Sequence, residues 1–600
     1  MNLFAKNLNY FYHNIPQFYE LIKNIKTRRF QIKNNNIFDT QTNTYFYPME
    51  NNKSLMYEVN ELYANNPMKN HLWTKYFLSK ELPYYDEKIL PITSKICNQI
   101  IDISKNSDSF NDEGYYYDRQ FLYTTTIFGL GSGLHLEYLT QKYRFQSLFV
   151  YEPEEEFFAI SCYFVDYERI YETLKDKFYL FIKGNIDTKI LKRFYDSRTI
   201  TSNFLRLEFT TYNSPKIENA KKEFHLANIS NKRGWGSFED ESVGFKNHLN
   251  NINKDIPILS GIKKIEAPVF VIANGASLEN DIEWIKANQE NMIIISVGTS
   301  IRPLLKAGIQ SDFHIEIERM PKLVEILRPS LEKYKGYFVG ASVIDSEHFK
   351  IAKKPLMFVR DASSTTGISN YYLNFCSPMV GNTGFSFAAH FSDEVYMVGF
   401  DVGFKKGKRV HAKGSFYDDK DDIEKGSPVK GNFSNDIYSN DLLNLSRQNL
   451  EMAISLLKPK KVYNLSDGAF INGAIPKRSK DIKLSKIDKY KYIKEIVVNF
   501  KKDKIKLLNY KGFLELYKNK IIELLDKNPK NRKELTEIID LVNDYTLAFL
   551  NHVPAVGTLM RGTIWHILNI IYISLHKIGI DEYPKLISIV KKNINRYSLD

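Results

Sequence analysis

Two segments of this chain predict the same local arrangement: a β-strand, a glycine turn, a helix and a second strand. In the first, the β-branched and aromatic run 121–130 ends in glycine and precedes a helical stretch and an apolar strand at 148–151. In the second, the apolar run 268–273 is followed by an Asn-Gly turn, a helix and another apolar strand at 292–297. Strands that alternate with helices in this way are typical of parallel, doubly wound α/β sheets.

The first glycine turn carries part of a nucleotide-binding pattern. Gly129, Gly131 and Gly133 permit a tight turn at a helix N-terminus, where backbone N–H groups can face an anion or a ribose. Glu152 follows Gly129 by 23 positions, about where a ribose-binding acid lies in such units. Because the spacing is GxGxG and not the full GxGxxG, two interpretations stay open: a small-molecule site, or a Rossmann-like unit without a ligand.

The central region continues the α/β pattern. Short apolar strands are expected at 313–317, 337–342, 356–359 and 395–400, with helices between them. The last of these strands ends at Asp401. Alternation over this length predicts a second doubly wound sheet.

Length and pattern together predict a multidomain α/β protein with two Rossmann-like doubly wound α/β domains and a helical C-terminal domain. A chain of 600 residues exceeds one hydrophobic core, because cores stop growing at about 250–300 residues. After residue 480 the apolar spacing is helical. The expected domains are an N-terminal mixed, mostly helical region at 1–110, a Rossmann-like domain at 111–262, a central domain at 263–478 and the helical domain at 479–600.

Three turns of the central region combine glycine with Asn, Ser or Thr just before a helix, at 274–277, 298–300 and 381–384. In an open parallel sheet such turns gather at the carboxyl ends of the strands, where ligands bind. Glycine lets the backbone approach a ligand, while hydroxyls and amides can bond to phosphate, ribose or base edges. The candidate substrate-binding residues are Asn274, Gly275, Ser277, Thr299, Asn382, Thr383 and Gly384.

The three turns together favour a nucleotide-type ligand. No GxxxxGK[ST] motif is present, which excludes a P-loop NTPase, and the set suits a nucleoside monophosphate leaving group better than a triphosphate. Ser277 is also expected to cap the helix that follows it, because serine is a favoured N-cap residue.

Composition restricts the partners and the compartment. The net charge is +13, but acids are interspersed in the most basic stretch, 477–506, so we interpret it as a solvated face and expect no nucleic-acid partner. The three cysteines form no CxxC pair, which fits a reducing cytosol. No signal-peptide pattern opens the chain, and the apolar segment 564–575 is shorter than the ~20 residues of a membrane span. We expect a cytoplasmic protein with no transmembrane segment.

Several motifs resemble known families. The segment 269–285, VFVIANGASLENDIEWI, resembles the strand–NGxSL–helix opening of bacterial sialyltransferases that use CMP-sugars. The segment 380–404, with GNTGF and VGFDVGF, resembles their later glycine turn, helix and strand that ends in Gly-x-Asp. The order of FGLGSG, NGASL, GNTGF, VGFDVGF, His411 and the segment 463–474 resembles the motility accessory factor (Maf) flagellin glycosyltransferases. The resemblance covers roughly residues 120–475.

This resemblance implies a glycosyltransferase reaction. The chain would move a nonulosonic acid, of the pseudaminic or legionaminic acid type, from CMP-nonulosonic acid to Ser/Thr hydroxyls of flagellin. No cofactor is expected, because the CMP-sugar is the donor substrate. Asn274, Gly275 and Ser277 match the nucleotide-binding NGxS turn of the sialyltransferases, and Thr383 and Gly384 match their second nucleotide turn.

The chain departs from the sialyltransferase pattern in two places. Thr299 follows glycine in the turn after the second strand, where those enzymes carry Asn. They also use tyrosines to hold the CMP phosphate, whereas here the helix after Gly384 begins with Phe385 and Ser386. The phosphate contact therefore stays open among Tyr371, Tyr372, Arg360 and Tyr417.

The chemistry requires fixed donors on the phosphate and a base for the acceptor hydroxyl, because breaking the C–O bond to CMP builds oxocarbenium-like charge. His411, ten residues after the strand-end Asp401, is the candidate catalytic base, since histidine titrates near neutral pH. No metal is expected, because no DxD motif stands beside the glycine turns. The acidic residues of 418–422 lie in a charged loop that we interpret as solvated surface.

Three other functions stay open. Some archaeal pterin pyrophosphokinases share the NGxSL-type core, so a hydroxymethylpterin pyrophosphokinase-like enzyme is one alternative. A non-catalytic flagellin-binding or chaperone module is another. The Gly129–Gly133 turn alone would also suit an S-adenosylmethionine methyltransferase, but no NPPY-like motif follows it. The sequence indicates neither an oligomeric state nor a ligand for the Gly129–Gly133 domain.

Overall fold

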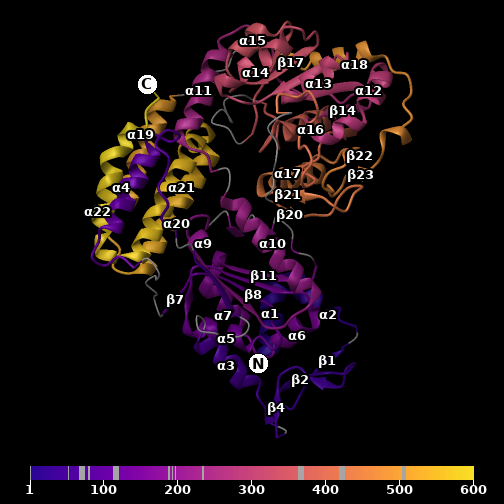
Figure 1. The fold of residues 1–600 in the computed structure, drawn as a ribbon. Helices are drawn as coiled ribbons and strands as arrows, with labels where there is room; N and C mark the ends of the chain where they lie inside the picture. Colours follow the sequence, from indigo (N-terminus) through magenta and orange to yellow (C-terminus); the bar gives the residue numbers. More distant parts are fainter. Residues whose placement is uncertain are drawn as a thin grey trace. The chain divides into compact units, whose positions relative to one another are not determined.

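The computed structural model forms two compact units, each built from segments far apart in the sequence (Figure 1). Unit 1 comprises Met1–Trp235, Lys518–Thr546 and Ile564–Tyr597, and unit 2 comprises Gly236–Tyr517, Leu547–Thr563 and Ser598–Asp600. The structure describes residues 2–599 except for 27, 52, 67–73, 79–80, 112–119, 185, 187–189, 192–193, 196–197, 233–234, 362–370, 418–425 and 503–508. The four predicted domains remain a proposal for how the chain divides further.

Unit 1 is organised around a five-stranded sheet with the strand order β11-β10-β8-β12-β6. Its strands are β6 Thr74–Leu78, β8 Thr124–Phe128, β10 Leu148–Glu152, β11 Phe178–Ile182 and β12 Leu205–Thr210. They pair in parallel, except that β6 is antiparallel to β12 at one edge. Every residue of β8, β10 and β12 is buried, as expected for a parallel sheet that is covered on both faces.

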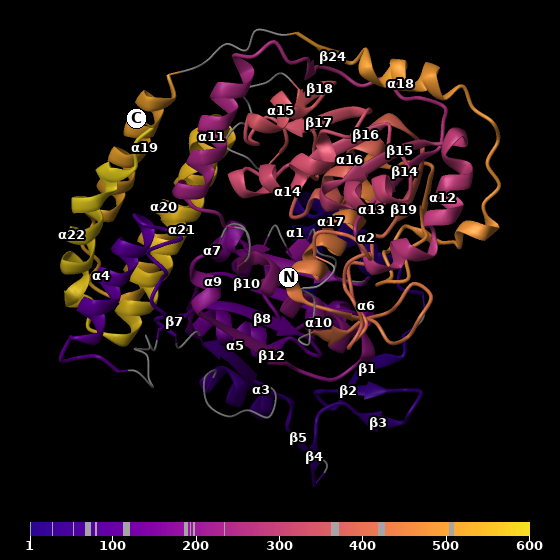
Figure 2. The ribbon, with the colours of Figure 1, turned by 45° about the horizontal axis from the view of Figure 1, so that its top comes forward.

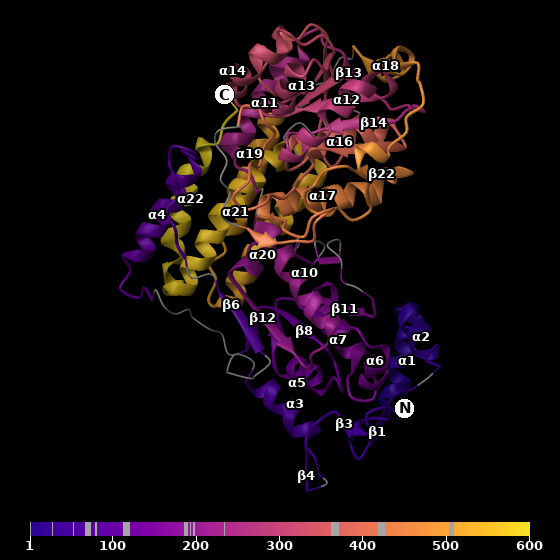
Figure 3. The same ribbon diagram turned by 45° about the vertical axis from the view of Figure 1, so that its right-hand side comes forward.

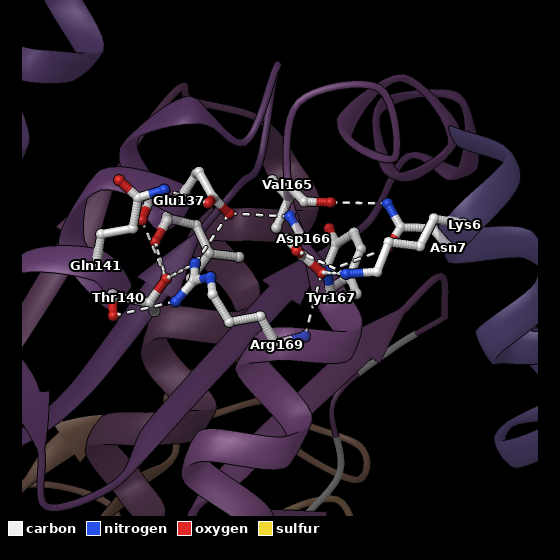
Figure 4. Close-up of polar contacts among 10 residues, drawn as sticks. Lys6, Asn7, Glu137, Thr140, Gln141, Val165, Asp166, Tyr167 and Arg169 are labelled. Carbon is white, nitrogen blue, oxygen red and sulfur yellow. Dashed lines mark hydrogen bonds and ion pairs between the residues drawn. The ribbon is translucent and has the colours of Figure 1, made fainter. Parts of the chain in front are cut away.

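Buried polar contacts fasten the first helix of unit 1 to the helices that follow β8 and β10 (Figure 4). The helices concerned are α1 Leu3–Asn14, α5 Leu134–Lys142, α6 Glu155–Ser161 and α7 Tyr167–Leu174. The Nδ2 of Asn7 donates to the carbonyl oxygens of Cys162 (2.9 Å) and Val165 (2.7 Å). An ion pair of 3.0 Å between Arg169 and Glu137 links α7 to α5. The N-terminal helix therefore belongs to the same packed body as the sheet.

The C-terminal segment is helical, as its apolar spacing predicts. Its helices are α19 Tyr510–Leu525, α20 Arg532–His552, α21 Pro554–Lys577 and α22 Tyr583–Asn593. Within unit 1, α22 packs against α4 (Thr93–Lys105), and the hydroxyls of Thr93 and Tyr597 lie 3.1 Å apart. Tyr123, just before β8, is hydrogen-bonded to His576 of α21 at 3.0 Å. The last helices thus pack with elements from the first quarter of the chain.

Unit 2 is organised around a ten-stranded sheet with the order β23-β22-β19-β14-β15-β16-β17-β18-β13-β24 (Figure 2). Its strands are β13 Ile258–Leu259, β14 Val269–Ile272, β15 Ile293–Val297, β16 Phe313–Glu316, β17 Tyr337–Ala341, β18 Pro355–Phe358, β19 Glu394–Val398, β22 Lys461–Asn464, β23 Ile475–Pro476 and β24 Phe500–Lys501. The pairs are parallel except for β13 with β24. Val269 and Val271 enter one hydrophobic core, and Phe270 and Ile272 enter another, so β14 is buried on both faces.

The strand order of unit 2 reverses beside β14. The helical elements that follow its strands include η2 Ala276–Asn280, α12 Ile282–Asn288, η4 Gly298–Ser300, α13 Ile301–Lys306, α14 Pro321–Leu331, α16 Val380–Phe391 and α17 Asp441–Leu457. β14 pairs on one side with β15, the next strand of the sheet in the chain, and on the other with the much later β19. α16 packs against both neighbours and against β14 itself (Figure 3). Open α/β sheets bind ligands at the carboxyl ends of strands where the order reverses in this way.

The expected multidomain α/β class is confirmed by the two parallel sheets and their covering helices. Within the described part of the chain, no helix is both long and apolar enough to cross a membrane. The three cysteines, Cys97, Cys162 and Cys376, are buried and form no disulfide.

Candidate active site

The turn after β14 is held against the end of β19 by a buried carboxylate. The backbone N–H of Ser277 donates to Asp401 Oδ2 at 3.0 Å, and its hydroxyl donates to Asp401 Oδ1. A Cβ on Gly275 would lie 2.5 Å from Asp401 Cγ and 2.6 Å from the oxygen of Gly399. Only glycine therefore fits this turn, because any side chain would push β14 and β19 apart.

The prediction that Ser277 caps the following helix is wrong. The cap position of η2 is Gly275, which makes no side-chain hydrogen bond, and the Ser277 hydroxyl is committed to Asp401. Burial raises the pKa of Asp401 to about 6, although the hydrogen bonds from Ser277 act to lower it. The carboxyl group of Asp401 thus fixes the turn through two hydrogen bonds from Ser277.

The turn after β15 is joined to the β14 turn by side chains. Asn274 Nδ2 donates to Thr299 Oγ1 at 2.8 Å, and Thr299 is half-buried. The other amide atom, Asn274 Oδ1, is buried and has no hydrogen-bond partner in the structure. Ser300, by contrast, is committed to the backbone, since its hydroxyl donates to Ile272 O at 2.8 Å. Asn274 and Thr299 are thus the members of this pair of turns that face the edge of the sheet.

The predicted loop at 381–384 is the first turn of α16, and its side chains are bonded inside the protein. Asn382 Nδ2 donates to Ser446 O at 2.9 Å, and Thr383 Oγ1 donates to Cys376 O at 2.9 Å. A Cβ on Gly384 would lie 2.4 Å from Val297 Cγ1, so this glycine lets α16 approach the sheet. A ligand at this position would meet the helix N-terminus and not the side chains of these three residues.

The segment that carries His411 lies directly beside the β14 turn. His411 and Gly275 form an antiparallel bridge, and Ala412 N donates to Asn274 O at 3.0 Å. The ring of His411 is half-buried and lies 5.1 Å from the ring of Tyr417. His390, the other histidine of this region, is bonded to its own helix through Ser386 O at 2.7 Å, and burial lowers its pKa.

The other candidates for the phosphate contact lie near the end of β18. Arg360 forms a backbone bridge with Leu373, Tyr371 packs against the core and Tyr372 is 39% exposed. Residues 362–370 and the acidic residues at 418–422 lie outside the described part of the chain. Among the described residues, no group of three or more His, Cys, Asp or Glu side chains is arranged to hold a metal ion.

Sequence reasoning missed Glu316, the last residue of β16. Its side chain is almost fully buried, and its Oε1 accepts hydrogen bonds from the backbone N–H groups of Ile317 (2.7 Å) and Glu318 (3.0 Å). Its Oε2 is buried without a partner, and burial raises the pKa of the carboxyl to about 7. The available signal was a carboxylate at the end of the apolar run 313–317.

Buried polar atoms without partners recur along this edge. They are Asn464 Nδ2 at the end of β22, Asn274 Oδ1 after β14, Glu316 Oε2 at the end of β16 and Ser342 Oγ after β17. Buried polar groups in proteins are nearly always hydrogen-bonded. The ends of several strands of one sheet therefore carry polar atoms whose hydrogen-bonding capacity is unused.

In the glycine turn of unit 1, by contrast, the polar atoms have hydrogen-bond partners within the protein. Glu152 Oε2 accepts from Leu130 N at 2.6 Å, and Glu152 Oε1 accepts from the Tyr212 hydroxyl at 2.5 Å. Ser132 N donates to the hydroxyl of Tyr47 at 3.0 Å, and a Cβ on Gly131 would lie 2.7 Å from that same hydroxyl. The protein's own side chains occupy the positions where a nucleotide would bond, which favours the ligand-free interpretation of this unit.

Comparison with known proteins found two family models and a solved structure that resemble this chain. Residues 3–227 match the family model of the glycosyltransferase Maf N-terminal domain. The N-terminal part of the chain thus matches the Maf family. The structure of a Maf glycosyltransferase from Magnetospirillum magneticum AMB-1 matches with a TM-score of 0.72 and 20% identity, over 99% of this chain and 94% of that one. The resemblance to Maf proteins is thus confirmed, and the match to this family model supports a glycosyltransferase function.

A second match covers most strands of the ten-stranded sheet of unit 2. Residues 244–407, which include β14 to β19, match the model described as 6-hydroxymethylpterin diphosphokinase MptE-like. None of the curated proteins matches the chain. The resemblance of the central region to CMP-sugar sialyltransferases stays a prediction.

Proposed function

We propose that the chain transfers a nonulosonic acid, of the pseudaminic or legionaminic acid type, from CMP to Ser/Thr hydroxyls of flagellin. The observation that carries this proposal is the carboxyl edge beside β14, where Asn274 keeps a buried amide oxygen free and Thr299 and His411 lie next to it. The match of residues 3–227 to the Maf N-terminal domain supports the transfer of a sugar. The CMP donor and the flagellin acceptor are the parts of this proposal that go beyond the transfer of a sugar.

In the proposed reaction, the edge of the sheet binds the nucleotide and the histidine acts on the acceptor. Asn274 and Thr299 present hydrogen-bonding groups, and the N-terminus of α16 adds a partial positive charge suited to the CMP phosphate. The bond between the sugar carbon and the phosphate oxygen breaks, and CMP leaves as an anion. His411 then accepts the proton of the attacking hydroxyl, which becomes the new glycosidic oxygen. No metal or cofactor takes part in this proposal.

The second match gives one alternative function a specific basis. Residues 244–407 match a pterin diphosphokinase model, and a diphosphate transfer would use the same glycine turns. That enzyme would consume ATP and a hydroxymethylpterin. Incubation of the chain with both substrates therefore separates the two functions, since the proposed transferase forms no pterin diphosphate.

The test of the proposed function is the intact mass of flagellin. We expect flagellin incubated with the chain and CMP-pseudaminic or CMP-legionaminic acid to gain mass in steps of one sugar residue. Flagellin incubated with the sugar nucleotide alone is the control. An unchanged mass with both donors, together with formation of a pterin diphosphate from ATP, would replace this proposal by the alternative.

A further inference from the structure

We infer that Glu316 is a sugar-recognition residue, whose free carboxylate oxygen accepts a hydrogen bond from a hydroxyl or amide N–H of the sugar carried by CMP. This inference rests on the proposed function. It assigns a task to a side chain that no motif identifies, and it divides the edge of the sheet into a nucleotide part and a sugar part.

The two carboxylate oxygens of Glu316 have different surroundings. Oε1 is held by the N–H groups of Ile317 and Glu318, at 2.7 and 3.0 Å, so the side chain has one fixed orientation. Oε2 has no partner and belongs to a residue that is only 1% exposed. An unpaired buried carboxylate oxygen is costly, because water no longer solvates it. A ligand group that donates a hydrogen bond would remove this cost.

The adjacent turn places no side chain against the free oxygen. Val297 of β15 pairs with Ile315 of β16, which brings Gly298 next to Glu316. A Cβ on Gly298 would lie 4.0 Å from Glu316 Oε2 and 3.0 Å from Val380 Cγ1. Glycine also suits the backbone there, since its φ is +53°. Gly298 therefore adds no side chain between this turn and the free oxygen.

The position of Glu316 in the sheet separates it from the nucleotide contacts. Asn274 follows β14 and Glu316 ends β16, with β15 between them. Two strand spacings amount to about 10 Å, since neighbouring strands lie about 4.8 Å apart. A nucleotide bound over Asn274 and Thr299 would place its attached sugar at about this distance.

The chemistry of the group selects its partner. A donor group placed at Oε2 favours the ionised form of the carboxyl, which only accepts hydrogen bonds. The phosphate of CMP and the carboxylate of the sugar acid would be repelled by this ionised form. Sugar hydroxyls and the N–H of an acylated amino group are donors and would be attracted. We therefore assign Glu316 to the polyhydroxylated part of the donor and not to its anionic parts.

The variant Glu316→Gln tests this assignment sharply. The two N–H groups at Oε1 require an acceptor, so the glutamine oxygen takes that position and its NH₂ takes the place of Oε2. The variant keeps the size and the local bonds of the side chain but offers donors where the sugar also offers donors. Glu318→Gln is the matched control, because Glu318 is the exposed carboxylate two positions away.

The measurement is calorimetric binding of CMP, CMP-pseudaminic acid and CMP-legionaminic acid to the full chain. We expect Glu316→Gln to bind CMP within twofold of wild type and to bind the CMP-sugar at least tenfold more weakly, with Glu318→Gln unchanged. Wild-type affinity of Glu316→Gln for the CMP-sugar, or an equal loss for CMP itself, would overturn the inference alone. If the wild type binds neither CMP nor a CMP-sugar, the proposed function and this inference fall together.

Discussion

The glycine turns of the two sheets differ in how their polar atoms are used. In unit 1 the acid that follows the turn, Glu152, accepts hydrogen bonds on both oxygens, and Tyr47 covers the turn. In unit 2 the turn at Asn274 and the nearby Glu316 each keep one buried oxygen without a partner. Burial raises the pKa of both glutamates to about 7, so burial alone does not distinguish them. Unused bonding capacity distinguishes a ligand-binding edge from a closed one.

The largest expected effect is on catalysis in unit 2. His411→Ala should lower the rate of sugar transfer by ~10²–10⁴-fold, because a general base acts in the transition state. Binding of the CMP-sugar should change little, since the histidine is assigned to the acceptor proton. The transfer rate and the calorimetric affinity are to be measured side by side, with the exposed His552→Ala as control. A wild-type rate for His411→Ala would exclude this histidine as the base.

A smaller effect is expected on nucleotide binding at the open turn. Asn274→Ala should weaken CMP binding by ~3–10-fold, because its free amide oxygen would accept a hydrogen bond from a neutral ribose hydroxyl or cytosine amino group, and such bonds contribute about 0.5–1.5 kcal/mol. Ser277→Ala should act in the same direction, since it removes the hydroxyl bond to Asp401 and leaves only the backbone N–H bond to hold the turn. Asn280→Ala is the matched control, as Asn280 is exposed in the same short helix. CMP affinity within twofold of wild type for the Asn274→Ala, Ser277→Ala double variant would move the nucleotide elsewhere.

Replacing each of the two buried glutamates by glutamine should change the pH dependence of the free energy of unfolding in different ways. The pKa of Glu316, about 7, lies above its ordinary value of 4.5, so its contribution to stability is complete below pH 4.5 and is lost as the pH rises through 7. Glu316→Gln removes this loss and should raise the free energy of unfolding at pH 8 by up to about 3 kcal/mol, but not at pH 4.

Glu152→Gln should give no such gain, because the single amide oxygen cannot accept from the backbone N–H groups of both Leu130 and Glu154, which bond to different oxygens of the carboxylate. Urea unfolding at pH 4 and pH 8 measures both variants. An equal rise in the free energy of unfolding for both variants at pH 8 would mean that the hydrogen bonds to Glu152 do not stabilise the protein. The two turns would then not differ in the way described.

The smallest effect is expected at the closed turn. Tyr47→Phe removes the hydroxyl that bonds to Ser132 N and should cost about 1–3 kcal/mol of stability while transfer stays at the wild-type rate. Tyr45→Phe, in the small sheet nearby, is the control. If Tyr47→Phe keeps its stability but loses transfer, the turn of unit 1 takes part in the reaction.

The fold could be predicted from the sequence where the signal is local. The strand at 268–273 and the turn at Asn274 are set by a buried apolar run followed by residues that favour turns. The turn predicted at 381–384 is helical, because Asn382 and Thr383 find partners in Ser446 and Cys376. Asn, Gly and Thr favour turns only when no tertiary partner takes up their side chains.

The candidate site could be predicted only in part, because its decisive contacts are distant in sequence. Ser277 looks like a helix cap until Asp401, 124 positions later, is placed beneath it. Glu316 ends a buried strand, as many structural residues do, and only its unpaired oxygen marks it. Patterns at short range identify turns, whereas unpaired atoms appear only once the strands are placed side by side.

Hydrogen exchange of the full chain with and without CMP tests the central claim most directly. The account predicts slower exchange in the segments 273–279, 296–300 and 409–412, which form the edge beside β14, and no change in 129–135. The first three segments lie in unit 2 and the segment 129–135 lies in unit 1, so a single experiment compares both turns. Protection of 129–135 with none at 273–279 would contradict the account, because it would place the nucleotide on the turn that the protein's own side chains close.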